Sequence, residues 1–179
     1  MQDILRFHVP CKKEYTKLVE DFARISALHL NPNGDEEFKS KICAVMNEVF
    51  VNIVNHSKTA DENECVRFQF EIGLKYFSIS IYDYGPGFEA EGKLPPYPKE
   101  FIGKKYKLRD VIDGQVSYRV VDPFSISFVF EKNEDLGENP KKLSDSGLGM
   151  SIITKLMDTV TYSYIGNGKF DWKLYKKFD

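Results

Sequence analysis

The strongest structural signal in the sequence is a run of apolar residues at helical spacing between positions 42 and 54. These residues recur at intervals of three and four, at Ile42, Val45, Met46, Val49, Phe50, Ile53 and Val54. A repeat close to the helical period of about 3.6 residues predicts an amphipathic helix with one continuous apolar stripe. Such a stripe must be buried, so this helix has to pack against a sheet or against other helices.

Weaker patterns on either side predict the elements that bury it. Alternation of apolar and polar residues predicts five strands, over residues 4–9, 66–70, 77–82, 161–164 and 170–174. Helical spacing recurs over 15–26 and over 150–160. Helices on one face of a mixed, largely antiparallel sheet make an α+β fold, here a two-layer α/β sandwich.

The length and texture of the chain predict one domain that carries an insertion. A chain of 179 residues fits a single domain over 1–179, and the sequence between 89 and 146 has a mixed pattern that is long for a connection. Within this insertion, residues 118–121 and 124–130 are expected to form a hairpin. We interpret the basic run 104–109 as a solvated loop.

Composition excludes several classes of protein. With 42% hydrophobic residues the chain can form a core, and Cys11, Cys43 and Cys65 lack the spacing of a disulfide framework or a zinc site. The N-terminal residues do not resemble a secretory signal, and no apolar run reaches the ~18 residues of a membrane span. A net charge of −2 without a basic block gives no indication of a nucleic-acid partner. We therefore expect a cytoplasmic protein.

A polar stripe lies beside the apolar stripe of the predicted central helix. Glu48, Asn52 and His56 are spaced four residues apart, and Asn55 is close to them. One interpretation is a polar helix edge that makes local hydrogen bonds. The other is a functional site, in which the amide oxygen of Asn52 binds a hard cation such as Mg²⁺ and Glu48 accepts the proton of a hydroxyl nucleophile.

A second unusual segment follows the strand over 77–82. Asp83 continues the phase of Ile79 and Ile81, which directs its carboxylate toward the apolar side of the sheet. A buried carboxylate needs a hydrogen-bond donor, and the amine of a purine base is one candidate. Gly85 and Gly87 permit a tight turn beside such a ring. A simple Asp-Gly turn at the end of a strand is the alternative.

The third segment precedes the last predicted helix. It consists of Ser146, Gly147, Leu148, Gly149 and Met150. Backbone N–H groups at a glycine-rich helix start can bind an anion, although many helices begin this way without a ligand. The spacing of a P-loop and that of a Rossmann site are both missing from the sequence.

In their order, these segments resemble the N, G1 and G2 boxes of the gyrase, Hsp90, histidine-kinase and MutL (GHKL) ATPase superfamily. Within it, the chain is most similar to the RsbW/SpoIIAB branch of anti-sigma-factor serine kinases, over residues 1–88 and 143–179. The insertion is not covered by the resemblance. The fold it implies, the histidine-kinase-like or Bergerat sandwich, agrees with the predicted pattern.

The resemblance implies a role for each segment. Glu48 would be the catalytic base, Asn52 a ligand of Mg²⁺, and Asp83 the acceptor of the adenine amine of ATP or ADP. The other nucleotide-binding residues that it implies are Asn55, His56, Gly85, Gly87, Phe88, Ser146, Gly147, Leu148, Gly149 and Met150. Trp172, Tyr162 and Tyr164 are interpreted as sheet core.

The implied activity is phosphorylation of a serine or threonine in a STAS-domain partner, in a pathway that regulates transcription. By the same resemblance the kinase would be a homodimer that sequesters a sigma factor. The alternative is a nucleotide-responsive module that sequesters a protein without kinase activity. Asp145 and Ser146 stand where many such kinases have a basic residue, for which Lys105, Arg109, Lys141 or Lys142 are possible replacements. Three roles stay open for the extra hairpin of the insertion: it covers the nucleotide, it binds a partner, or it obstructs either of these.

Overall fold

The computed structural model describes residues 3–30, 36–56, 65–73, 75–132 and 148–177. Its strands are β1 (Asp3–Pro10), β2 (Cys65–Ile72), β3 (Tyr76–Asp83), β4 (Lys105–Val111), β5 (Gly114–Asp122), β6 (Ser125–Lys132), β7 (Thr159–Gly166) and β8 (Lys169–Lys177). Its helices are α1 (Thr16–Leu30), α2 (Glu36–His56) and α3 (Leu148–Leu156), with two short 3-10 helices, η1 (Lys13–Tyr15) and η2 (Lys99–Phe101). None of the helices in these ranges has the length and apolar content needed to span a membrane.

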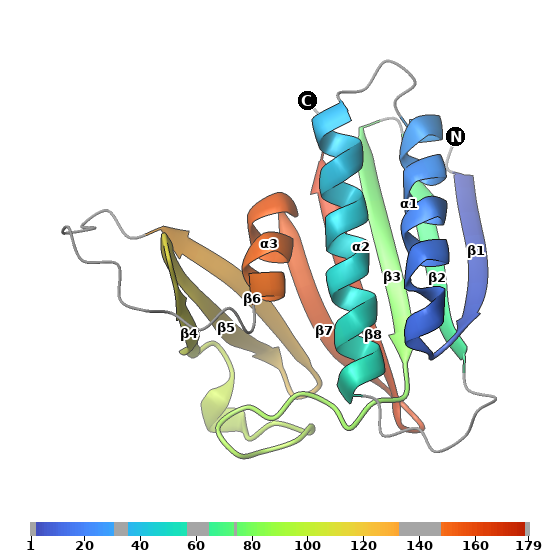
Figure 1. Ribbon diagram of the computed structural model, residues 1–179. Helices are drawn as coiled ribbons and strands as arrows, with labels where there is room; N and C mark the ends of the chain where they lie inside the picture. The colour runs from blue at the N-terminus through green and yellow to red at the C-terminus, as the bar shows by residue number, and fades with distance from the viewer. Residues whose placement is uncertain (1–2, 31–35, 57–64, 74, 133–147, 178–179) are drawn as a thin grey trace.

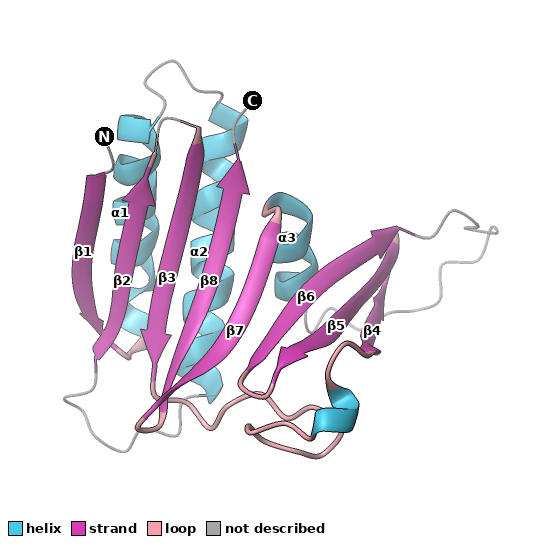
Figure 2. Cartoon of the chain, turned by 180° about the vertical axis from the view of Figure 1, so that it is seen from behind, coloured by secondary structure: helices cyan, strands magenta, loops and turns pink. Residues whose placement is uncertain are grey.

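The strands form one sheet in the order β1-β2-β3-β8-β7-β6-β5-β4, and each strand is antiparallel to its neighbours. The three α-helices all lie on the same face of this sheet (Figures 1 and 2). The prediction of an α+β two-layer sandwich is therefore confirmed. The parallel pairing seen among the described residues is the isolated bridge between Ile102 and Val120.

Helix α2 occupies the centre of the helical layer, as its apolar stripe requires. Phe50 and Met46 are fully buried, and they belong to the same core cluster as Phe68, Phe70 and Ile79 of the sheet. Phe50 lies 6.1 Å from the ring of Phe68. Burial of side chains of this size contributes on the order of 1.5–3 kcal/mol each, so the stripe fixes α2 against β2 and β3.

The insertion extends the sheet, because β6 pairs with β7 and carries β5 and β4 outward. The predicted hairpin is present as β5 and β6. The prediction of a solvated loop over 104–109 is wrong, because these residues fall largely within β4. Their backbone pairs with β5, and Tyr106 stacks on Tyr118 with ring centroids 5.4 Å apart, which gives this basic strand a half-buried face.

The last helix is shorter than its periodicity predicts. Helix α3 ends at Leu156, and Val160 lies in β7, where it pairs with Leu174. The backbone N–H of Asp158 bonds to the carbonyl of Tyr175 at 2.9 Å. Pairing with β8 therefore replaces a further helical turn, while Val160 keeps the burial that its apolar character favours.

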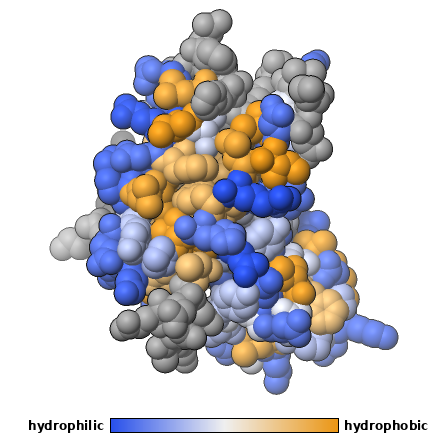
Figure 3. Space-filling model, turned by 90° about the vertical axis from the view of Figure 1, so that its right-hand side faces the viewer, coloured by the Kyte–Doolittle hydropathy of each residue, from blue (hydrophilic) through white to orange (hydrophobic). Residues whose placement is uncertain are grey.

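The outer side of α1 and the adjacent edge of the sheet expose apolar side chains. Leu18 and Ile25 are 53% and 55% exposed, and Leu28 and Leu5 are also exposed. Figure 3 shows apolar residues gathered on this side of the molecule. β1 is the edge strand here, so an apolar surface lies next to a strand with one unpaired edge.

Candidate functional site

A cavity of about 770 Å³ lies between the helical layer and the sheet, where the insertion joins the rest of the chain. The predicted site residues that line it are Glu48, Asn52, Asn55, His56, Asp83, Gly85, Gly87, Phe88, Gly149 and Met150. Leu148 is the first residue of α3, whereas Ser146 and Gly147 lie outside the described residues. The volume falls within the range of small-molecule and cofactor sites.

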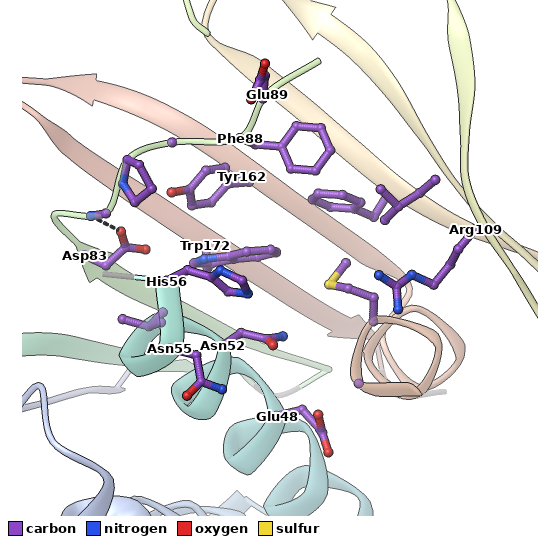
Figure 4. Close-up of a pocket in the computed structure, with 18 of the residues that line it drawn as sticks. Glu48, Asn52, Asn55, His56, Asp83, Phe88, Glu89, Arg109, Tyr162 and Trp172 are labelled. Atoms are coloured by element: carbon purple, nitrogen blue, oxygen red, sulfur yellow. Dashed lines mark hydrogen bonds between the residues drawn. The ribbon is translucent and has the colours of Figure 1, made fainter. Parts of the chain in front are cut away.

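Helix α2 supplies the polar wall of this cavity. Glu48 and Asn52 are half-buried, whereas Asn55 and His56, in the last turn, are exposed at its mouth. Figure 4 shows Asn52 and His56 directed toward Trp172 and Glu48 directed toward α3. The polar stripe of the sequence therefore borders a concave site instead of an open helix surface.

Asp83 provides a buried carboxylate at one end of the cavity. It is 4% exposed, accepts the N–H of Gly85 at 2.7 Å and is hydrogen-bonded by the hydroxyl of Tyr162. The pKa of Asp83 is raised to about 6, mainly by burial. The hydrogen bonds from Gly85 and Tyr162 lower this pKa, and the nearby carboxylate of Asp171 raises it. A carboxylate held in this way has remaining lone pairs for a ligand that donates a hydrogen bond.

The turn after β3 requires glycine at position 87. Gly87 has a φ of +88°, and a Cβ atom there would lie 2.7 Å from Cζ of Phe170. Any larger residue would therefore be strained and would push into the sheet. The tight turn expected beside Asp83 is present, and it brings Phe88 into the cavity wall.

Aromatic residues of the sheet form the opposite wall. Trp172 and Tyr162 line the cavity, so the interpretation of both as sheet core is incomplete, whereas Tyr164 packs on Phe170 at 5.2 Å. Phe128, which lies 5.6 Å from Trp172, comes from the insertion. Trp172 pairs with Ile81 on β3 and with Tyr162 on β7, so these three side chains lie on the same face of the sheet. The sequence contains no signal for the register of the insertion, which adds Phe128 to this face.

Gly149 brings the first turn of α3 into contact with Glu48. A Cβ atom at position 149 would overlap the Glu48 carboxylate and lie 3.0 Å from its Cδ atom. Glycine therefore leaves room for this carboxylate beside the helix start, where the helix dipole stabilises a negative charge. This contact fixes Glu48 relative to α3.

Gly149→Ala should displace the Glu48 carboxylate while the fold is kept, because alanine favours a helix and the carboxylate end of Glu48 can move. We expect any activity that depends on Glu48 to fall at least about tenfold, with thermal unfolding little changed. Thr154→Ala is the control on the same helix. The Thr154 hydroxyl donates a hydrogen bond to the Met150 carbonyl at 2.7 Å, so its removal changes a contact within α3 without adding an atom beside Glu48. Equal activity of the Gly149 variant and wild type would contradict this placement of Glu48.

Comparison with known protein families agrees with this geometry. The model of the histidine kinase-like ATPase domain matches residues 11–170, which is most of the chain and includes the insertion. No curated protein matches the sequence closely enough to narrow the family. Membership in this family implies binding of ATP or ADP. The chain belongs to the histidine kinase-like ATPase family.

Proposed function

We propose that this protein is a Mg-ATP-dependent serine/threonine protein kinase of the RsbW/SpoIIAB type, which phosphorylates a STAS-domain partner. The observation that carries the proposal is the convergence of Glu48, Asn52 and Asp83, from two different elements, on one nucleotide-sized cavity. Each has a chemical character that phosphoryl transfer from ATP needs: a base, a hard-cation ligand and an acceptor for the purine amine.

The Asp83 end of the cavity fits the adenine ring. The carboxylate can accept the exocyclic amine, and Trp172 and Phe128 offer apolar ring surfaces nearby. Among the described residues, the donors to the buried Asp83 carboxylate are the N–H of Gly85 and the hydroxyl of Tyr162. A ligand amine would supply the further hydrogen bond that a buried carboxylate favours.

The Glu48 end fits the triphosphate together with Mg²⁺. Among the described residues, no three His, Cys, Asp or Glu side chains are grouped to hold a metal by themselves. Mg²⁺ often binds through one or two protein oxygens and completes its shell with nucleotide phosphates and water, so Asn52 is a suitable ligand. When bound, the cation neutralises charge on the phosphates.

Glu48 is placed to act as the base in this reaction. It would accept the proton of the partner's serine hydroxyl while the γ-phosphoryl group moves to that oxygen and ADP leaves. Incubation with γ-labelled ATP, Mg²⁺ and purified STAS-domain proteins of the source organism tests the proposal. We expect label on a serine or threonine of one of them. Absence of transfer to all of them, with ATP still bound, would contradict kinase activity.

Asn52→Ala should remove most of the gain in ATP affinity that Mg²⁺ produces, because the variant lacks the amide oxygen proposed to ligate the cation. Titrations with and without Mg²⁺ measure this gain. Asn55→Ala is the matched control for the magnesium effect, since it deletes a neighbouring amide from the same cavity wall. It should keep the full gain in affinity from Mg²⁺, even if its overall affinity for ATP changes. A full magnesium effect in Asn52→Ala would rule out this role for Asn52.

A second candidate is a module that sequesters a protein in response to nucleotide without phosphorylating it. The insertion favours this alternative, because Val121, Phe124 and Val129 are exposed apolar side chains on it. Capture of a STAS-domain protein or sigma factor that depends on ADP or ATP, with no label transferred, is the result expected of such a module.

The apolar surface on α1 and β1 supports a homodimer in either case. Leu18, Ile25 and Leu28 lie within one arc of α1, close to the open edge of β1. A second copy could cover the same patch by two-fold symmetry. Sedimentation of the wild type and of Ile25→Asp would report the association, with a monomeric variant expected.

A further inference from the structure

We propose that Arg109, on the inserted strand β4, binds the phosphate groups of the nucleotide. This inference rests on the proposed function. It adds that the insertion supplies a positively charged residue of the nucleotide site. Among the described residues that line the cavity, Arg109 is the only lysine or arginine, whereas Glu48, Asp83 and Glu89 are acidic. Within the described part of the chain, Arg109 is therefore the lysine or arginine that can supply positive charge to a polyphosphate in this cavity, in addition to a bound cation.

A β-bulge directs Arg109 into the cavity. The register of β4 on β5 shifts between Lys107 and Arg109, and consecutive residues Leu108 and Arg109 both line the cavity. In a regular strand, successive side chains point to opposite faces, so only one of the two would do so. Bulges re-aim side chains in this way and are common next to active sites.

Arg109 lies at the end of the cavity where the phosphates of a bound nucleotide are expected. Figure 4 shows Asp83 at one side of the cavity and Arg109 at the other, with Trp172 between them. Asp83 is an acceptor and suits the base amine, whereas a guanidinium has only donors and suits anionic oxygens. A nucleotide with its base at Asp83 therefore extends its phosphates toward Arg109 and the first turn of α3.

Contacts with α3 fix the insertion in this position. Lys155 of α3 pairs with Asp113, in the turn between β4 and β5, at 2.7 Å. The same ammonium group lies 4.6 Å from the ring centroid of Phe130 on β6. Since α3 also carries Gly149 and Met150, these contacts place β4 relative to the rest of the phosphate end.

Calorimetric titration of Arg109→Ala with ATP, ADP and adenosine in Mg²⁺ buffer tests the inference. Arg109 is exposed to solvent, so its contribution to binding should lie at the low end of the range for a hydrogen bond to a charged group. We therefore expect about a tenfold loss in ATP affinity. Adenosine affinity should stay within about twofold, since the base end is unchanged. Arg109→Lys should recover part of the loss, because it keeps the charge without the planar fork.

Arg119→Ala is the matched control, because Arg119 is an exposed arginine on the same extension that does not line the cavity. It should bind all three ligands like the wild type. Unchanged ATP affinity in Arg109→Ala, or an equal loss for adenosine, would overturn the inference while leaving the nucleotide site intact. Failure of the wild type itself to bind ATP or ADP would instead refute the proposed function, and the role of Arg109 with it.

Discussion

Glu48→Gln should abolish measurable phosphoryl transfer while ADP still binds with nearly wild-type affinity. The substitution keeps the size of the side chain against Gly149 but removes its capacity to accept a proton. Loss of a general base lowers a rate by about 10²- to 10⁴-fold, which is the expected decrease in labelled partner formed per unit time. Parallel calorimetry with ADP separates this effect from a binding defect.

Glu89→Gln is the control for Glu48→Gln, because Glu89 is the other glutamate that lines the cavity and is exposed. It should transfer phosphate at the wild-type rate. Transfer that survives in Glu48→Gln, or ADP binding lost together with transfer, would show that Glu48 is not the base.

Asp83→Asn should weaken ATP and ADP binding by at least about tenfold, since a charged acceptor for the purine amine is replaced by a neutral amide whose NH₂ group cannot accept a hydrogen bond. The same variant should make the free protein more stable at pH 8. The wild type must hold an ionised carboxylate there at a position that is 4% exposed.

The sign of this stability effect follows from the direction of the pKa shift. The pKa of Asp83 is about 6 in the folded protein, above the ordinary value of 3.8, so the folded state binds more protons than the unfolded state between about pH 4 and 6. The contribution of Asp83 to stability therefore falls as pH rises through this window. The gain from Asp83→Asn, on the order of 2–3 kcal/mol at pH 8, should disappear near pH 4.

Asp171 offers a matched control for Asp83. Burial raises its pKa to about 6 as well, but it neighbours Trp172 on β8 and does not line the cavity. Asp171→Asn should therefore change the pH dependence of unfolding in the same direction and leave nucleotide affinity unchanged. If Asp83→Asn and Asp171→Asn bind ATP equally well, the assignment of Asp83 to the base is incorrect.

The sequence predicts the parts of the site that depend on local periodicity. The stripe of Glu48, Asn52 and His56 and the phase of Asp83 each follow from one helix or one strand, and both face the cavity in the structure. The structure describes only part of the segment 146–150. Helix α3 begins at Leu148, and the next two residues, Gly149 and Met150, line the cavity as predicted.

Local patterns do not predict which residues of the insertion reach the cavity, although the family resemblance gives Arg109 as one of four candidate basic residues. Phe128, Leu108 and Arg109 reach the cavity because β6 pairs with β7 and because β4 contains a bulge. Pairing between strands distant in sequence and a one-residue register shift both depend on tertiary packing. For the same reason the sequence of the basic run 104–109 predicts a loop, although most of it is strand β4.

Calorimetric titration of the wild-type protein with ATP and with ADP, each with and without Mg²⁺, tests the central claim most directly. A single site per chain with higher affinity in Mg²⁺ is the result that a cavity built from Glu48, Asn52 and Asp83 predicts. If neither nucleotide binds under either condition, the cavity is not a nucleotide site and the proposed kinase activity is excluded.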